Sequence, residues 1–142
     1  MREILFRGRC TGEDDIYGWV DGFYVRLRDS YKKRESHRIY TGFAECDCGS
    51  FYGDCYEVDP ETVGQFTGLF DKNGKRIFEG DIVLYRNESA GVVSFVDGAF
   101  GVRFGDGTSA MFLCFAAEHS VIIGNIHDDK ELVKVYNLFT TY

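Results

Sequence analysis

Apolar and polar residues alternate over two adjacent segments of the chain, residues 91–96 and 99–104. This period of two is typical of strands that bury one face and expose the other. Asp97 and Gly98 separate the segments, and Asp-Gly is a strong signal for a two-residue hairpin turn. The sequence therefore predicts a half-buried β-hairpin here, with a positive φ angle at Gly98.

Similar patterns predict short strands along most of the chain. Asn73 and Gly74 form the strongest turn signal, because both residues tolerate the positive φ that a type I′ turn requires. We expect irregular loops in the charged segment 29–36 and in the segment 46–56, which is rich in Gly, Asp and Tyr. The expected strands are residues 3–8, 16–27, 37–43, 62–67, 76–78, 91–96, 99–104, 111–115 and 120–126.

Only the C-terminal tail has a helical pattern. Asp128 is the expected cap of a helix over residues 129–136. Leu132, Val135 and Tyr136 have the spacing of one apolar stripe on such a helix.

The order of elements after Phe78 predicts a small barrel. Several short strands separated by Gly-containing turns suit an SH3-like barrel, in which Gly and bulges carry the curvature. Gly80 and Asp81 fit its opening turn, since Gly80 tolerates positive φ and Asp81 can accept hydrogen bonds from nearby backbone N–H groups. We therefore expect a mainly β protein: an N-terminal β-hairpin region with a Cys- and Tyr-rich loop in residues 1–60, and a small SH3-like β-barrel with a short C-terminal helix in residues 61–142.

Composition favours strands over helices and sets limits on function. The chain has 142 residues with 17 Gly, 1 Pro and 16% aromatic residues, which suits strands and tight turns. A net charge of −7 argues against a large phosphate-binding surface and so against nucleic acid as a partner. No apolar stretch has the length of a signal peptide or a membrane span, so we expect a cytoplasmic protein with no membrane partner. Its five Cys are expected to be reduced thiols.

Five segments of the chain resemble the signatures of one protein family. They are residues 1–8, 60–69, 71–75, 77–83 and 123–128. In these segments the chain is similar to the YopX family of phage and prophage proteins. The resemblance implies a mostly β protein with an SH3-like barrel, encoded by a temperate phage or a prophage and acting in a bacterial host cell. It implies no particular activity, so no functional residues are carried over.

Cys46, Cys48 and Cys55, with His37 nearby in sequence, are the candidate metal ligands. Thiolates and imidazole are ligands that zinc prefers. The spacing is poor, however, because zinc sites favour Cys pairs separated by two residues and the chain has no second pair. Free thiols in a loop are the alternative, and we predict no metal site.

Glu79, Asp81, Asp97 and Asp106 are the candidate acid–base residues. Paired carboxylates can transfer protons or bind a cation, but Asp beside Gly far more often stabilises a turn. No His lies in a nucleophile or metal motif, and no Gly-rich phosphate loop is present. We therefore predict no catalytic residues and no cofactor, and we expect a protein that is not an enzyme.

The aromatic residues divide into two sets. One is expected to fill the core, because a small barrel needs bulky inward side chains. The other crowds the N-terminal half, where Tyr suits a partly apolar and partly wet protein interface. The expected core set is Phe95, Phe100, Phe104, Phe112 and Phe115, and the expected surface set is Tyr17, Tyr24, Tyr31, Tyr40, Tyr52 and Tyr56.

These observations favour a non-enzymatic phage or prophage accessory protein that binds another protein, from the host or from the phage. The alternative is an SH3-like module that binds nucleic acid through a local basic patch. Open strand edges and the surplus of Tyr also favour a homo-oligomer, with a dimer as its default form. The basic patch consists of Arg26, Arg28, Lys32, Lys33 and Arg34.

Overall fold

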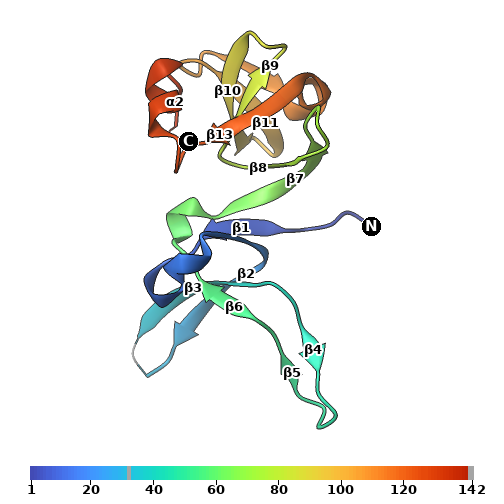
Figure 1. Ribbon diagram of the computed structural model, residues 1–142, viewed down its shortest axis with the longest axis vertical. Helices are drawn as coiled ribbons and strands as arrows, with labels where there is room; N and C mark the ends of the chain where they lie inside the picture. Colours follow the sequence, from blue (N-terminus) through green and yellow to red (C-terminus); the bar gives the residue numbers. More distant parts are fainter. Residues whose placement is uncertain (32, 141–142) are drawn as a thin grey trace. The chain divides into compact units, whose positions relative to one another are not determined.

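The computed structural model describes residues 1–31 and 33–140, and antiparallel strands are its main elements (Figure 1). Its antiparallel sheets and short C-terminal helix confirm the mainly β class. The chain divides into two compact units, residues 3–65 and 66–142. The division into regions 1–60 and 61–142 stays a prediction. Within the described residues, no helix has the length and apolar character needed to cross a membrane.

In the first unit, four antiparallel strands are hydrogen-bonded neighbours in the order β6-β3-β2-β1. The pairing of β1 with β2 runs from Phe6 opposite Gly22 to Arg9 opposite Trp19, which confirms the predicted N-terminal hairpin. A 3-10 helix, η1, connects these strands. The bounds are β1 (Phe6–Arg9), η1 (Gly12–Tyr17), β2 (Trp19–Asp29), β3 (Arg34–Tyr40) and β6 (Cys55–Glu57).

A small apolar cluster holds the first unit together. Cys10, Ile39 and Val58 are buried, and Val20 and Tyr24 pack against them. Val20 and Tyr24 lie on one face of β2 because side chains alternate along a strand.

Both predicted loops of the first unit contain strands. In the segment 29–36, β2 and β3 continue through the charged residues, since Asp29 pairs with Arg34. In the segment 46–56, β5 (Phe51–Tyr52) pairs with β4 (Ala44–Glu45), which lies just before the segment, and the two form a narrow ribbon (Figure 1). Both segments form strands because they pair with a neighbouring strand, and this pairing cannot be read from the local sequence.

The reduced state expected for all five Cys is wrong for two of them. Cys46 and Cys48 form a disulfide in the turn of the β4–β5 ribbon. Gly49 N donates to Cys46 O at 2.9 Å, and this tight turn holds the two Cα atoms 5.3 Å apart, within disulfide reach. Cys10, Cys55 and Cys114 are free.

A five-stranded antiparallel sheet in the order β12-β11-β10-β9-β13 forms the second unit. The strands follow one another as a meander, and the first strand, β9, also pairs with the last, β13. Before this sheet, β7 pairs with β8. The bounds are β7 (Gly64–Phe70), β8 (Arg76–Phe78), β9 (Asp81–Tyr85), β10 (Ser89–Val96), β11 (Ala99–Phe104), β12 (Ser109–Phe112) and β13 (Ser120–Asn125).

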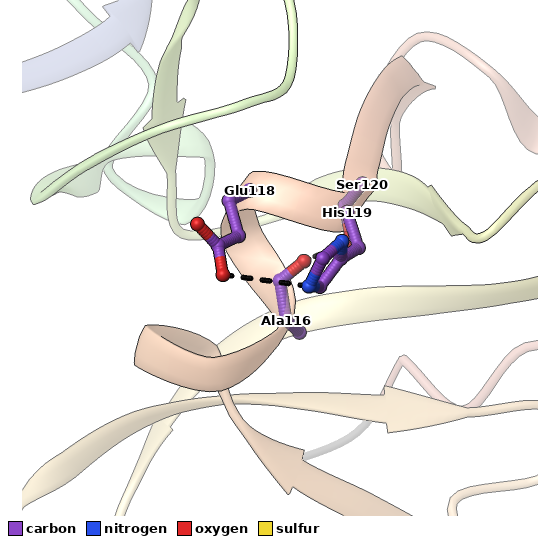
Figure 2. A network of polar contacts seen from close by, with 4 residues as sticks. All are labelled: Ala116, Glu118, His119 and Ser120. Atoms are coloured by element: carbon purple, nitrogen blue, oxygen red, sulfur yellow. Dashed lines mark hydrogen bonds and ion pairs between the residues drawn. The ribbon is translucent and has the colours of Figure 1, made fainter.

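Short helical turns connect β12 to β13. They are α1 (Leu113–Ala116) and η3 (Ala117–His119). Figure 2 shows how this connection ends: Ser120 Oγ donates to Ala116 O at 2.8 Å, and Glu118 lies 3.4 Å from the His119 ring nitrogen. The Ser120 hydroxyl thus ties the first residue of β13 to the helical turn before it.

Apolar side chains cover both faces of the five-stranded sheet. On one face, Val93 and Val102 pack with Ile77 and Leu113. On the other, Ile82, Val92, Ile126 and Leu138 form a second buried cluster, which Leu132 and Val133 of α2 (Lys130–Val135) complete. Residues adjacent in sequence on β10 therefore enter different clusters, as the alternation of a strand requires.

The two predicted turns are present, but they differ in type. Asp97 and Gly98 both have positive φ, 52° and 82°, and Val96 pairs with Ala99, which confirms a two-residue turn. At the other turn Gly74 has the expected positive φ, 78°, but Asn73 does not, so the turn is not of type I′.

The carboxylate of Asp71 explains the second turn. Its Oδ1 accepts hydrogen bonds from the N–H groups of Asn73 and Lys75, both at 2.9 Å. Its Oδ2 accepts from Ile122 N at 3.1 Å, which joins the turn to β13. The hydrogen bonds to the Asp71 carboxylate stabilise this turn, which therefore does not need the backbone geometry of a type I′ turn.

The C-terminal helix is shorter than predicted and presents a different face. Asp129 precedes it, and the Asp129 carboxylate accepts from Asn125 N rather than capping the helix. Leu132 contacts the core as expected, but Val135 is exposed. A helix of six residues has few turns, so local docking decides which side chains are buried.

Candidate functional site

A groove of about 520 Å³ lies at the β10–β11–β12 end of the sheet in the second unit. Residues of β10, β11, β12 and α1 line it. The volume is within the range of sites that bind ligands, and the lining is mostly apolar. We take this groove as the candidate site.

The floor of the groove is low because small residues occupy it. Ser94, Gly101 and Phe112 lie side by side across three strands, so the Ser94 and Phe112 side chains project from the same face, on either side of Gly101. Gly101, in the middle of this row, has no side chain, and Ala99 and Ala110 are its small neighbours in the lining. A Cβ atom at Gly101 would lie 3.3 Å from Met111 O and would begin to fill the floor.

Two exposed phenylalanines form one side of the groove. Phe112 is 60% and Phe115 67% exposed, and their ring centroids are 6.4 Å apart in an edge-to-face arrangement. The prediction that both lie in the core is therefore wrong. The strand expected over residues 111–115 becomes the helix α1 at Leu113, and Leu113 and Ala116 bury the inner face of its single turn.

The other three predicted core phenylalanines divide as well. Phe100 and Phe104 pack against the buried cluster, as predicted. Phe95 is 51% exposed, so its place in the core is also corrected. It lies near the end of β10, beyond the buried valines, and its ring packs only edge-on against Phe100 with centroids 4.9 Å apart.

One buried polar group in the groove lining has no hydrogen bond. Ser94 is 1% exposed, and its Oγ finds no partner among the described residues. A buried hydroxyl without a hydrogen bond typically costs about 1–3 kcal/mol of stability. Such a group in the wall of a groove points to a ligand that supplies the missing partner.

Two charged residues mark the ends of the groove along β11. Asp97 lies in the turn before this strand, and Arg103 lies near its end. Arg103 is four positions after Ala99, which corresponds to about 13 Å in an extended strand. The Arg103 guanidinium stands over the ring of Phe139, 5.4 Å from its centroid. The groove is therefore an apolar channel with charge only at its ends.

The structure does not bring the candidate metal ligands together. Cys46 and Cys48 are bonded to each other, and Cys55 Sγ lies 3.7 Å from an Arg38 guanidinium nitrogen. His37 Nδ1 shares a 2.5 Å hydrogen bond with the Tyr24 hydroxyl. Across residues 1–31 and 33–140, no group of three His, Cys, Asp or Glu side chains has the arrangement of a metal site.

Two of the four candidate acid–base residues, Asp81 and Asp106, stabilise turns. Asp81 Oδ2 accepts from Phe78 N at 2.8 Å beside Gly80, whose φ is 86°. Asp106 Oδ1 accepts from Thr108 N at 3.0 Å, and hydrogen bonds from the Thr108 side chain and backbone lower the pKa of this carboxyl. These contacts confirm turn chemistry at Asp81 and Asp106.

The basic residues of the predicted patch alternate with acidic ones on the β2–β3 hairpin. Arg28 lies opposite Glu35, and Arg34 lies opposite Asp29. Lys32 lies outside the described residues. The hairpin therefore presents mixed charge along this stretch.

The predicted surface tyrosines have mixed environments. Tyr24 and Tyr56 pack against the buried cluster of the first unit, and Tyr17 contacts Tyr56 with ring centroids 4.9 Å apart. Tyr40 stacks on Phe43 at 5.3 Å, and Tyr31 is exposed. The Tyr52 side chain lies outside what the structure describes.

Sequence reasoning did not find the groove. One usable signal is Gly101 within an alternating strand, since a strand glycine often marks a close approach by a ligand or another backbone. The helical turn that exposes Phe112 and Phe115 follows from tertiary packing and has no local signal of comparable strength.

Comparisons with known proteins give one family and one similar fold. The family model described as YopX protein matches residues 20–134. A similar solved structure is the crystal structure of protein EF1440 from Enterococcus faecalis, with 25% sequence identity and a TM-score of 0.58. The similarity covers 94% of this chain and 99% of that chain. No curated protein matches the chain.

Proposed function

The chain belongs to the YopX family, and on this premise we propose that it is a phage or prophage accessory protein that binds another protein and catalyses no reaction. The observation that carries the binding proposal is the exposed pair Phe112 and Phe115 beside the groove. Exposed aromatic side chains next to a concave apolar surface are typical of protein interfaces.

The finer fold belongs to the same proposal: the second unit is a small SH3-like barrel. Its support is the pairing of β9 with both β10 and β13, which brings the two ends of the meander together. The irregular register between Ile122 and Gly124 and the positive φ of Gly80 are sources of the curvature that closure needs. A barrel would place the groove on a rigid wall.

A protein partner fits this site better than nucleic acid does. The groove lining has one cationic side chain, Arg103, and the net charge of the chain is −7. Phosphate contacts need several basic residues on one surface. In the first unit, Arg28 and Arg34 lie opposite Glu35 and Asp29. The proposed partner is a host or phage protein in the bacterial cytoplasm.

Affinity capture from the host with matched variants tests the proposal. Wild type, the double variant Phe112→Ala/Phe115→Ala and the control Phe95→Ala serve as baits, followed by mass spectrometry. Phe95 is a matched control because it is also a half-exposed phenylalanine of this sheet but does not line the groove. We expect one protein to be recovered with wild type and Phe95→Ala and lost with the double variant. Recovery that is equal with all three baits, or no specific recovery, would overturn the groove as the binding site.

A further inference from the structure

The groove has a specific chemistry that narrows the partner. We propose that it receives a tyrosine side chain from an extended segment of the partner, and that the phenolic hydroxyl pairs with the Ser94 hydroxyl. This inference rests on the proposed function and names the residue type that the site recognises. It starts from three observations: the apolar walls, the buried Ser94 hydroxyl without a partner and the neighbouring sheet edge.

The walls and the unpaired hydroxyl select a side chain with an apolar body and one polar tip. Phe112 and Gly101 offer a flat surface to an aromatic ring, and Ser94 offers one hydroxyl that can donate or accept. A phenol matches this pattern because it has one polar atom with the same two capacities. A phenylalanine ring would leave the Ser94 hydroxyl without a partner, and an amide side chain would bring polar atoms that the apolar walls cannot pair.

Access to the Ser94 hydroxyl requires a small movement. Its Oγ is shielded from water, while Phe112 in the same row is 60% exposed. Gly101 stands between them and has no side chain, and the proposal requires a change of rotamer at Phe112 that opens a path along the floor. Rotamer changes of exposed interface side chains are common on binding.

The edge strand explains why the tyrosine belongs to an extended segment. β12 is an edge strand of the sheet, and Ala110, Met111 and Phe112 of this strand line the groove. A strand added to an exposed sheet edge gains backbone hydrogen bonds and sends alternate side chains towards one face. One of these side chains would enter the groove beside Phe112.

Side-chain analogues give a direct test by NMR on the full chain. p-Cresol stands for tyrosine and toluene for phenylalanine, each titrated into wild type, Ser94→Ala, Phe112→Ala and Phe95→Ala. We expect p-cresol to shift the amide signals of Ser94, Gly101 and Phe112, and to bind roughly 3–10-fold more tightly than toluene, the factor that one hydrogen bond supplies. Ser94→Ala should remove this preference and leave toluene binding unchanged. Phe112→Ala should weaken both probes, and Phe95→Ala neither.

Several results would overturn the inference. They are equal affinity of the two probes for wild type, a preference that survives in Ser94→Ala, and shifts that fall outside the groove or are absent at low millimolar probe. If these occur while affinity capture still depends on Phe112 and Phe115, the groove binds a protein through other chemistry. A second copy of this chain could supply the tyrosine through Tyr31, which is exposed. Light scattering tests this: if wild type is a dimer and Tyr31→Ala is a monomer, the occupant is a second copy and not a separate partner.

Discussion

Two buried serines in the second unit should respond to alanine in opposite directions. Ser94 is 1% and Ser120 0% exposed, and both lie in strands of the same sheet. They differ in one respect: Ser120 Oγ donates to Ala116 O at 2.8 Å (Figure 2), whereas Ser94 Oγ has no partner among the described residues. The pair therefore separates the effect of a buried hydroxyl from the effect of its hydrogen bond.

The magnitudes follow from these environments. Ser120→Ala removes one buried hydrogen bond and should lower the free energy of unfolding by about 1 kcal/mol. Ser94→Ala removes a hydroxyl that is desolvated without compensation, a cost of about 1–3 kcal/mol, and leaves a space the size of one oxygen atom. After the loss of packing, we expect a net gain of about 1 kcal/mol.

Urea unfolding followed by far-UV circular dichroism measures both changes, and thermal melts should show shifts of about 2–4 °C in opposite directions. The control is the m-value, which should be the same in both variants, so that the shifts report stability alone. If Ser94→Ala destabilises the protein as much as Ser120→Ala does, the Ser94 hydroxyl has a partner in solution. The groove would then lose its unpaired group, and the tyrosine inference would lose its basis.

Three further predictions concern the turns and the thiols. Asp71→Ala should destabilise the protein by about 3 kcal/mol, measured by urea unfolding, because three backbone N–H groups lose their acceptor together; a change below that of Ser120→Ala would contradict this. Gly74→Val and Gly98→Val should each cost about 1 kcal/mol or more, because a branched side chain opposes the positive φ while nothing lies within 4 Å of the added Cβ; melting like that of wild type would refute it. Burial raises the pKa of the Cys10 thiol above its ordinary value of 9.0, and the charges of Asp14 and Asp15 raise it further while Arg9 opposes. The stability that this thiol contributes is thus present below its pKa in the unfolded chain and is lost as pH rises through its pKa in the folded protein. The free energy of unfolding, measured in urea, should therefore fall less steeply at alkaline pH in Cys10→Ser than in wild type. Identical pH profiles of the two proteins would argue against this.

Features fixed by a few neighbouring residues were predictable from the sequence. The Asp97-Gly98 turn needs two residues that accept positive φ, and the sequence supplies both at the end of two alternating segments. Gly80 and Asp81 likewise form the predicted turn, with the Asp81 carboxylate on a backbone N–H group. In each case, the constraint is local in the chain.

Features that depend on distant contacts were not predictable. The Asn73-Gly74 turn differs from expectation because the Asp71 carboxylate also holds Ile122, 51 residues away. Phe112 and Phe115 are exposed because the core takes Leu113 and Ala116 from the same short segment. An apolar run of this kind fits a strand or a helix equally well when only its sequence is known.

Ser94 shows why the candidate site required the structure. In the sequence it alternates with Val93 and Phe95, which predicts a polar residue on a solvated face. The structure shows that this face is also covered, since neighbouring Val92 belongs to the cluster beneath α2. A residue predicted to be solvated is therefore buried, and its hydroxyl becomes a cost to the free protein.

The same hydroxyl links stability to binding in a way that can be measured. In the free protein, Ser94→Ala should be the more stable form. A ligand that binds wild type roughly 3–10-fold more tightly than the variant stabilises wild type by an additional 0.7–1.4 kcal/mol or so at saturation. This gain is about the size of the initial deficit, so saturating p-cresol should bring the two melting temperatures together, with Phe112→Ala as the control for non-specific effects. A gap that stays constant as p-cresol is added would mean that the unpaired hydroxyl of Ser94 has no part in recognition.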